Sequence, residues 1–281
     1  HQPLPRLSAL NGQRAAALAQ YEACVRALRQ DLDVAPGPET VALYEQIRAG
    51  RMTGSPRRVD HSDTGQGAAP TVLSNLPAPL TPLIGREKEL AALEELLADP
   101  ARRLITLSGP GGSGKTRLAL EAAVEQIGRY RDGVYFVPLA GVEDVEAIVP
   151  TVAEVLDLPL YGAQEPLQQL VAYLRDKEML LVLDNFEHLL KGVEVVLAIL
   201  QAAPGVQAVV TSRSRLGLQG EQIFPVEGLA LPEPGEGAQE LARRGAVQLF
   251  VSAAQRGQPG FELGAGNAPG VARICRLVAG M

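Results

Sequence analysis

The sequence predicts an α/β fold in which helices flank a five-stranded parallel sheet. Three observations support this: short apolar runs without polar alternation, helical stretches between them, and a glycine-rich segment directly after the first run. The predicted strands cover residues 104–107, 134–137, 179–183, 208–211 and 222–226. The helical stretches between them include residues 117–127, 167–175 and 193–200. The runs are rich in leucine and β-branched residues, with residues 222–226 the weakest of the five, so we expect helices on both faces of the sheet.

The composition is that of a globular chain of about two domains. The 281 residues are 46% hydrophobic and 21% charged, with a formal net charge of −6. An acidic chain does not coat nucleic acid by itself, so we expect no direct DNA contact from these residues. The cysteines, Cys24 and Cys275, lie far apart, which argues against a disulfide framework and favours a reducing cytoplasm. No apolar run approaches the length of a membrane span, so no membrane contact is expected.

Residues 1–50 are predicted to form a helical segment. Between residues 11 and 33, apolar side chains recur at spacings of three and four and share one stripe of a helix. These are Leu18, Tyr21, Val25, Leu28 and Leu32. Residues 51–79 are rich in Gly, Pro, Ser, Thr and Asp and lack this periodicity, which predicts a linker. We interpret its Arg57-Arg58 pair as solvated charge rather than a nucleic-acid contact, because the chain as a whole is acidic.

Residues 80–230 are expected to form the sheet domain, and residues 231–281 the start of a further helical domain. A break rich in Pro, Gly and Glu ends the sheet, and a helix from about residue 238 to residue 255 follows. The chain begins with His1 and ends at Met281 inside an apolar pattern. We therefore expect a fragment whose last domain is truncated.

The glycine-rich segment, residues 109–116, matches the phosphate-loop pattern G-x-x-x-x-G-K-[ST] in full. Its glycines let successive backbone N–H groups converge on an anion at the N-terminus of the next helix. The alternative is a glycine-rich turn that caps an ordinary helix, but the strand and helix that the motif requires are both predicted. The sequence therefore predicts a P-loop NTPase domain. The expected nucleotide contacts here are Gly109, Gly111, Gly112, Ser113, Gly114, Lys115, Thr116 and Arg117.

Lys115 is expected to place a positive charge on the β- and γ-phosphates, and the Thr116 hydroxyl to coordinate Mg²⁺. The apolar run 179–183 ends in Asp184, which is a Walker B pattern. Taken alone, Asp184 could simply cap a turn; with a phosphate loop upstream, we expect it to hold the waters of the same Mg²⁺. The predicted cofactors are ATP or ADP with Mg²⁺.

Arg213, just after the fourth strand, is expected to sense the third phosphate, because a guanidinium can donate two hydrogen bonds to adjacent phosphate oxygens. Arg215 is a weaker candidate, and an ordinary surface arginine is the alternative. The place of a second acid after the Walker B aspartate holds Asn185, whose amide cannot accept a proton. Either Glu187 positions the attacking water or turnover is slow, and we expect slow ATP hydrolysis. The predicted catalytic residues are Lys115, Asp184, Glu187 and Arg213.

Four segments together resemble a known family. They are LTPLIGRE at residues 80–87, the phosphate loop, LDNFEH at residues 183–188 and TSR at residues 211–213. Over about residues 75–281 their order and spacing resemble the NB-ARC-like module of STAND signal-transduction ATPases, in the bacterial transcriptional-regulator branch. The resemblance implies that Ile84, Gly85 and Arg86 contact the adenine end of the nucleotide. It also implies that the C-terminal helices begin a domain packed on the nucleotide.

Residues 12–50 resemble the last helices of a bacterial transcriptional activator domain, a TPR-like module. In such regulators a winged-helix domain precedes it, so the resemblance implies DNA contact only through a domain absent from this chain. It further implies a cytoplasmic, nucleotide-controlled switch whose open form self-associates in the parent protein.

Two other function classes remain as alternatives. A metabolic P-loop ATPase or small-molecule kinase would need an acceptor pocket with a base, which no segment offers. An AAA+ motor would need a robust catalytic acid, and Asn185 weakens that interpretation.

Overall fold

The computed structural model describes residues 73–281 apart from residues 163 and 234. The chain divides into two units, residues 1–68 and 69–281, and the described residues belong to the second. The predicted helical segment 1–50 and most of the predicted linker 51–79 lie outside the described residues.

Five parallel strands form one sheet in the order β2-β3-β4-β1-β5, which confirms the predicted fold class. The strands are β1 (Leu104–Ser108), β2 (Val134–Pro138), β3 (Met179–Asp184), β4 (Val206–Ser212) and β5 (Glu221–Pro225). In register, Ser108 of β1 lies opposite Ser212 of β4. Because β4 separates β1 from β3, the residues that follow these three strands meet at one edge of the sheet.

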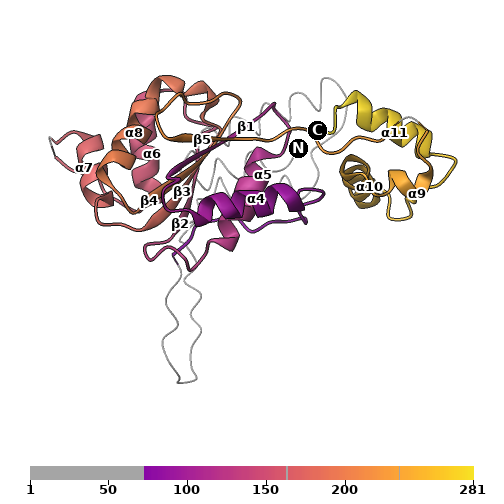
Figure 1. The fold of residues 1–281 in the computed structure, drawn as a ribbon. Helices are drawn as coiled ribbons and strands as arrows, with labels where there is room; N and C mark the ends of the chain where they lie inside the picture. The colour runs from indigo at the N-terminus through magenta and orange to yellow at the C-terminus, as the bar shows by residue number, and fades with distance from the viewer. Residues whose placement is uncertain (1–72, 163, 234) are drawn as a thin grey trace, which may run out of the picture. The chain divides into compact units, whose positions relative to one another are not determined.

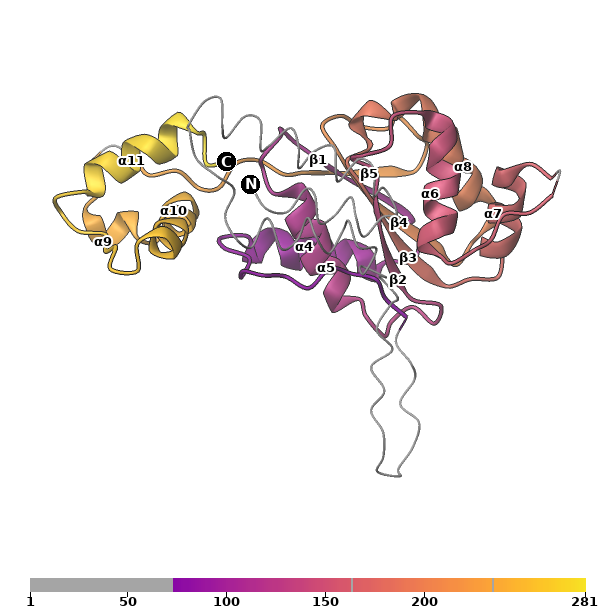
Figure 2. The ribbon, with the colours of Figure 1, turned by 180° about the vertical axis from the view of Figure 1, so that it is seen from behind.

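Helices cover both faces of the sheet (Figures 1 and 2). One face packs on α4 (Glu87–Ala98) and α5 (Lys115–Glu125), the other on α6 (Ile148–Val155), α7 (Pro166–Leu174) and α8 (Val193–Ala202). Successive side chains of β3 alternate between the two cores: Leu180 and Val182 join the first, Leu181 and Leu183 the second. This two-sided burial is why β3 is apolar at every position from Met179 to Leu183. Among the described residues, no helix is both long and apolar enough to cross a membrane.

Helices α4 and α6 were not predicted from the sequence, and the structure begins its ordered contacts before the predicted end of the linker at residue 79. Residues 73–79 lie within the predicted linker, yet Ser74 forms a parallel bridge with Val134 of β2. The side chain of Asn75 also pairs with the backbone of Phe136, donating to its carbonyl at 2.9 Å and accepting from its N–H at 2.7 Å. These contacts satisfy backbone groups at the open edge of β2, which composition alone does not reveal.

The predicted continuous helix from residue 238 to 255 is wrong. Two helices occupy this stretch, α9 (Ala238–Leu241) and α10 (Gly245–Gly257), followed by α11 (Ala268–Leu277). Arg244 is extended between them and forms ion pairs with Glu236 and, at 3.2 Å, with Glu233. The break brings Gly245 against Gly85, where a Cβ built on Gly245 would lie 3.4 Å from the Gly85 Cα atom. The interruption of the helix thus coincides with a contact to a residue far away in the sequence.

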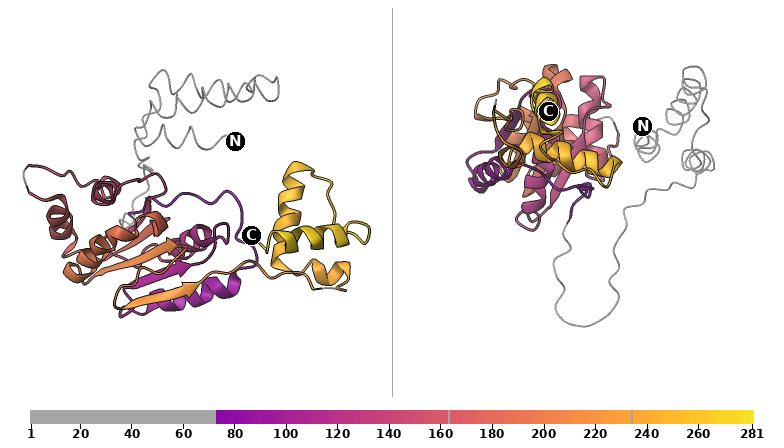
Figure 3. Two further views of the ribbon diagram at one scale, coloured as in Figure 1. Left: turned by 90° about the horizontal axis from the view of Figure 1, so that it is seen from above. Right: turned by 90° about the vertical axis from the view of Figure 1, so that its right-hand side faces the viewer.

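The end of the chain returns to the segment that leaves the sheet (Figure 3). The Leu229 N–H donates to the Gly280 carbonyl at 2.9 Å. A Cβ built on Gly228 would lie 2.1 Å from the carbonyl oxygen of Ala279, so only glycine fits at this crossing. The residues after α11 thus lie directly on the chain between β5 and α9.

We predict that Gly228→Ala destabilises the protein by about 1–3 kcal/mol, the usual cost of forcing extra volume into a packed contact. The measurement is urea unfolding of the full chain. Gly257→Ala is the control, because nothing lies within 4 Å of a Cβ built there and alanine favours a helix end more than glycine does. Equal stabilities of the Gly228→Ala variant and the parent would contradict this close contact.

Candidate functional site

The candidate site lies at the edge of the sheet where β1, β3 and β4 end. The phosphate loop follows β1, Asp184 ends β3, and Arg213 follows β4 directly. Since β4 is the central strand of these three, its last residues stand between the loop and Asp184. The sheet therefore brings together three segments that are separated along the chain.

The phosphate loop owes its shape to glycines in conformations that other residues avoid. Gly112 has φ +83° and Gly114 has φ +87°, both in the left-handed region. A Cβ on Gly109 would lie 2.1 Å from the Val226 carbonyl oxygen, so the start of the loop passes against the chain after β5. Helix α5 then begins at Lys115. This backbone has the left-handed glycines and the helix N-terminus that an anion-binding nest requires.

The Lys115 ammonium is buried and bends back over the loop. Its Nζ donates to the carbonyls of Gly109 at 2.9 Å and Pro110 at 2.8 Å. The pKa of this ammonium is lowered, chiefly by burial; Glu187 raises it, Arg213 lowers it and Asp184 raises it. To reach a phosphate, Lys115 must exchange these two carbonyls for phosphate oxygens.

Asp184 accepts two short hydrogen bonds on one oxygen. The hydroxyls of Thr116 and Thr211 each donate to Oδ1 at 2.6 Å. Within the described residues, Oδ2 of Asp184 receives no hydrogen bond, although the side chain is largely buried. The Thr116 hydroxyl and a carboxylate oxygen thus lie together, which is the oxygen donor set that Mg²⁺ prefers.

Thr211 is a site residue for which the sequence predicted no role. Besides donating to Asp184, its hydroxyl accepts the Asn185 N–H at 2.8 Å. Asn185 has φ +66°, a left-handed conformation that Asn tolerates better than most residues. Thr211 therefore fixes both the carboxylate and the turn that carries Glu187. The only signal in the sequence is a buried hydroxyl at the end of an apolar strand.

Glu187 and Arg213 form an ion pair in front of the loop, with 2.9 Å between Arg213 Nε and Glu187 Oε1. Glu187 Oε2 is buried and has no hydrogen-bond partner among the described residues. On the other side, Nη2 of Arg213 lies 3.3 Å from the position of a Cβ built on Gly111. The structure thus places the two residues predicted for water activation and phosphate sensing against each other.

Arg86 is buried and connects three segments. Its Nη1 pairs with Glu89 at 2.6 Å, and its Nη2 donates to the carbonyls of Ser113, at 2.9 Å, and Glu227. Gly85 precedes it at φ +65°, and Ile84 is partly buried. In the structure, Arg86 ties the loop backbone to the chain after β5. The adenine contact of Ile84, Gly85 and Arg86 stays a prediction.

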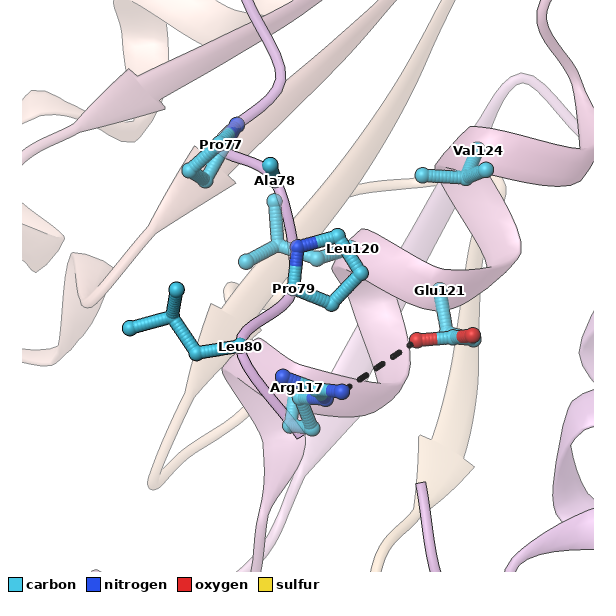
Figure 4. Close-up of a pocket in the computed structure, with 8 residues that line it drawn as sticks. All are labelled: Pro77, Ala78, Pro79, Leu80, Arg117, Leu120, Glu121 and Val124. Atoms are coloured by element: carbon cyan, nitrogen blue, oxygen red, sulfur yellow. Dashed lines mark ion pairs between the residues drawn. The ribbon is translucent and has the colours of Figure 1, made fainter. Parts of the chain in front are cut away.

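Arg117, in the first turn of α5, lies beside a shallow pocket of about 220 Å³ (Figure 4). It pairs with Glu121 at 3.7 Å and donates to the Thr81 carbonyl. The proline-rich segment 77–80 lines one side of the pocket, and partly buried side chains of α5 line the other. Arg117 thus anchors this segment to the helix, and its nucleotide contact stays a prediction.

Two protein families match the chain. Residues 6–48 match the family described as bacterial transcriptional activator domain. Residues 99–213 match the family described as AAA domain, a span that includes the phosphate loop, Asp184 and Arg213. Both matches fall on the modules that the sequence predicts.

The similar curated proteins include bacterial regulators. A Mycobacterium bovis protein named as a putative HTH-type transcriptional regulator is 36% identical over 180 residues, covering 64% of this chain and 19% of that protein. The regulatory protein AfsR of Streptomyces griseus is 28% identical over 263 residues, covering 87% of this chain and 26% of that protein. The chain thus spans about a fifth to a quarter of the length of these relatives.

Among solved structures, the chain is similar to a STAND protein with a tetratricopeptide repeat sensor from Pyrococcus horikoshii. The TM-score is 0.44 at 18% identity, covering 70% of this chain and 28% of that one.

We predict that Thr211→Val weakens Mg²⁺-dependent nucleotide binding about three- to tenfold, the usual effect of losing one buried hydrogen bond. Valine has nearly the same shape but cannot hold Asp184 or the Asn185 N–H. The measurement is calorimetric titration with ADP, once with Mg²⁺ and once with a chelator. Thr211→Ser keeps the hydroxyl and should bind as the parent does, whereas parental affinity in Thr211→Val would refute the positioning role.

Proposed function

We propose that this chain, which belongs to the P-loop ATPases of bacterial transcriptional regulators, binds ATP or ADP with Mg²⁺ and acts as a nucleotide-controlled switch. Binding of a nucleotide and Mg²⁺ in general follows from the P-loop module. The switch and the slow hydrolysis are the parts that we add.

The observation that carries the proposal is the meeting of Thr116, Thr211 and Asp184 beside the phosphate loop. The loop offers converging N–H groups, and Asp184 keeps Oδ2 without a hydrogen bond from the described residues. These donors fit a polyphosphate with a hard cation, because Mg²⁺ takes oxygen ligands and keeps several waters. When bound, Mg²⁺ would neutralise charge on the β- and γ-phosphates.

The contacts of the C-terminal helices support the switch. Met281 lies near the loop, since its Cβ is 3.5 Å from the position of a Cβ built on Gly112. Gly245 at the start of α10 packs on Gly85. A nucleotide in the loop would therefore lie close to Met281, which follows α11, and a nucleotide that also reached Gly85 would meet the start of α10. If it binds one arrangement of these helices more tightly than another, it shifts the population between them.

The nature of the catalytic groups supports slow hydrolysis. Asn185 cannot accept a proton, and Glu187 is engaged with Arg213 at 2.9 Å. We expect a turnover below about 1 s⁻¹, the low end of enzyme rates. In the parent regulator, which we expect to be cytoplasmic, a separate domain would contact DNA. We also expect the open form of the nucleotide-controlled switch to self-associate.

We predict that Lys115→Ala weakens ADP binding about ten- to a hundredfold, as expected for the loss of hydrogen bonds from a charged donor. The measurement is calorimetric titration with Mg²⁺ and ADP, together with an assay of ATP turnover in the parent chain. Lys191→Ala is the control, because this lysine is exposed in the short helix η3 (Leu190–Gly192). Unchanged affinity in Lys115→Ala would refute the site. Fast turnover, or transfer of phosphate to a small acceptor, would favour a metabolic enzyme instead.

We predict that Arg213→Ala lowers the affinity for a non-hydrolysable ATP analogue about tenfold and the affinity for ADP much less. A bidentate arginine–phosphate contact has this order of strength and exists only with the third phosphate. The comparison is the ratio of the two dissociation constants, with Arg215→Ala as the matched control. Equal losses for both nucleotides would refute the sensing role.

A further inference from the structure

The ion pair between Glu187 and Arg213 joins two side chains with different environments. The Glu187 side chain is 19% exposed and the Arg213 side chain 66% exposed. One oxygen of Glu187 accepts from Arg213 Nε, and the other is buried without a partner among the described residues. The carboxylate is thus partly desolvated, and the ion pair that it forms is with an exposed cation.

The pair lies beside the phosphate loop, where Arg213 is expected to contact the third phosphate of a nucleotide. Nη2 of Arg213 rests against Gly111 of the loop, and the charges of Glu187 and Arg213 both act on the nearby Lys115 ammonium. While it is paired, the charge of Arg213 is compensated, and a carboxylate stands beside the place that a phosphate would take. Both effects oppose binding of the third phosphate.

We propose that the Glu187–Arg213 pair is an autoinhibitory contact, which a third phosphate opens by competing with Glu187 for Arg213. The inference rests on the proposed function, because it requires a nucleotide in the loop. With a diphosphate, the pair stays closed, so Arg213 contributes nothing to affinity and Glu187 is withheld from water. With a triphosphate, Arg213 turns to the phosphate oxygens and Glu187 is released.

Once released, Glu187 can orient the attacking water. The water oxygen forms a bond to the γ-phosphorus while the bond from phosphorus to the bridging oxygen breaks, and ADP leaves with that oxygen. The proton of the water passes to the Glu187 carboxylate and then to solvent. The pair then closes again on the diphosphate state. The same contact therefore couples phosphate sensing to the start of hydrolysis.

The strengths of the contacts favour this exchange. Ion pairs with an exposed partner contribute little, whereas a bidentate contact between arginine and a doubly charged phosphate is stronger. The third phosphate should therefore displace Glu187 from Arg213. The apparent affinity for a triphosphate is nevertheless reduced by the free energy needed to break the ion pair. Removing the Glu187 carboxylate should therefore raise the affinity for a triphosphate. Removing an ordinary binding residue would lower this affinity instead.

The test is a double-mutant cycle of Glu187→Ala and Arg213→Ala in the full chain, with Mg²⁺ present. Dissociation constants are measured for ADP and for a non-hydrolysable ATP analogue. Glu187→Ala should tighten binding of the analogue about two- to fivefold, the range expected for a weak ion pair, and leave ADP unchanged. In the Arg213→Ala background the gain should be clearly smaller, because only the repulsion between the carboxylate and the phosphate is then removed. ATP turnover of Glu187→Ala should fall even though its affinity for the analogue rises.

Controls separate the possible failures. Glu187→Gln should also tighten binding of the ATP analogue. Glu143→Gln removes an exposed charge elsewhere and should change neither the dissociation constant of the analogue nor that of ADP. Unchanged or weaker binding of the analogue in both Glu187 variants, or an equal gain without Arg213, would overturn the autoinhibitory contact. If the parent chain bound neither nucleotide, or bound them as tightly with Lys115→Ala, the proposed function itself would fail.

Discussion

The site depends on one constraint, the position of β4 between β1 and β3. This order sets the end of β4 between the phosphate loop and the Walker B strand, where Thr211 can reach Asp184. Hydroxyls from α5 and β4 then donate to the same Asp184 oxygen at 2.6 Å. Three elements are held by one carboxylate, so its position is fixed from two sides. Without this strand order, the same residues would not meet.

Much of the fold could be predicted because its signals are local. Strands β1, β3 and β4 are largely buried on both faces, and two-sided burial leaves a largely apolar run in the sequence. The loop is equally local, since its left-handed glycines and the helix N-terminus occupy eight consecutive residues. The position of Asp184 at the end of a buried strand was predicted because this residue directly follows such an apolar run. The family matches at residues 6–48 and 99–213 bear out the resemblance that these motifs carried.

The features that the sequence did not reveal arise from contacts between distant residues. The break between α9 and α10 has no helix-breaking residue before Gly245; it coincides with the packing of Gly245 on Gly85. Arg86 belongs to a motif that is recognisable in the sequence. Its hydrogen bonds to the carbonyls of Ser113 and Glu227, however, join residues that only the tertiary structure brings together. Likewise, the roles predicted for Glu187 and Arg213 were separate, while the structure pairs them.

The cations around the loop already have partners within the chain. Lys115 donates to two loop carbonyls, Arg86 to two further carbonyls and to Glu89, and Arg213 to Glu187. Binding of a polyphosphate is therefore an exchange of partners, and affinity reflects only the difference between the old contacts and the new ones. The contacts of Lys115 must be exchanged for a diphosphate and a triphosphate alike, so they cannot separate the two. In the proposed mechanism, discrimination therefore falls to the Glu187–Arg213 pair, which only the third phosphate would disturb and which includes the most exposed of the three cations.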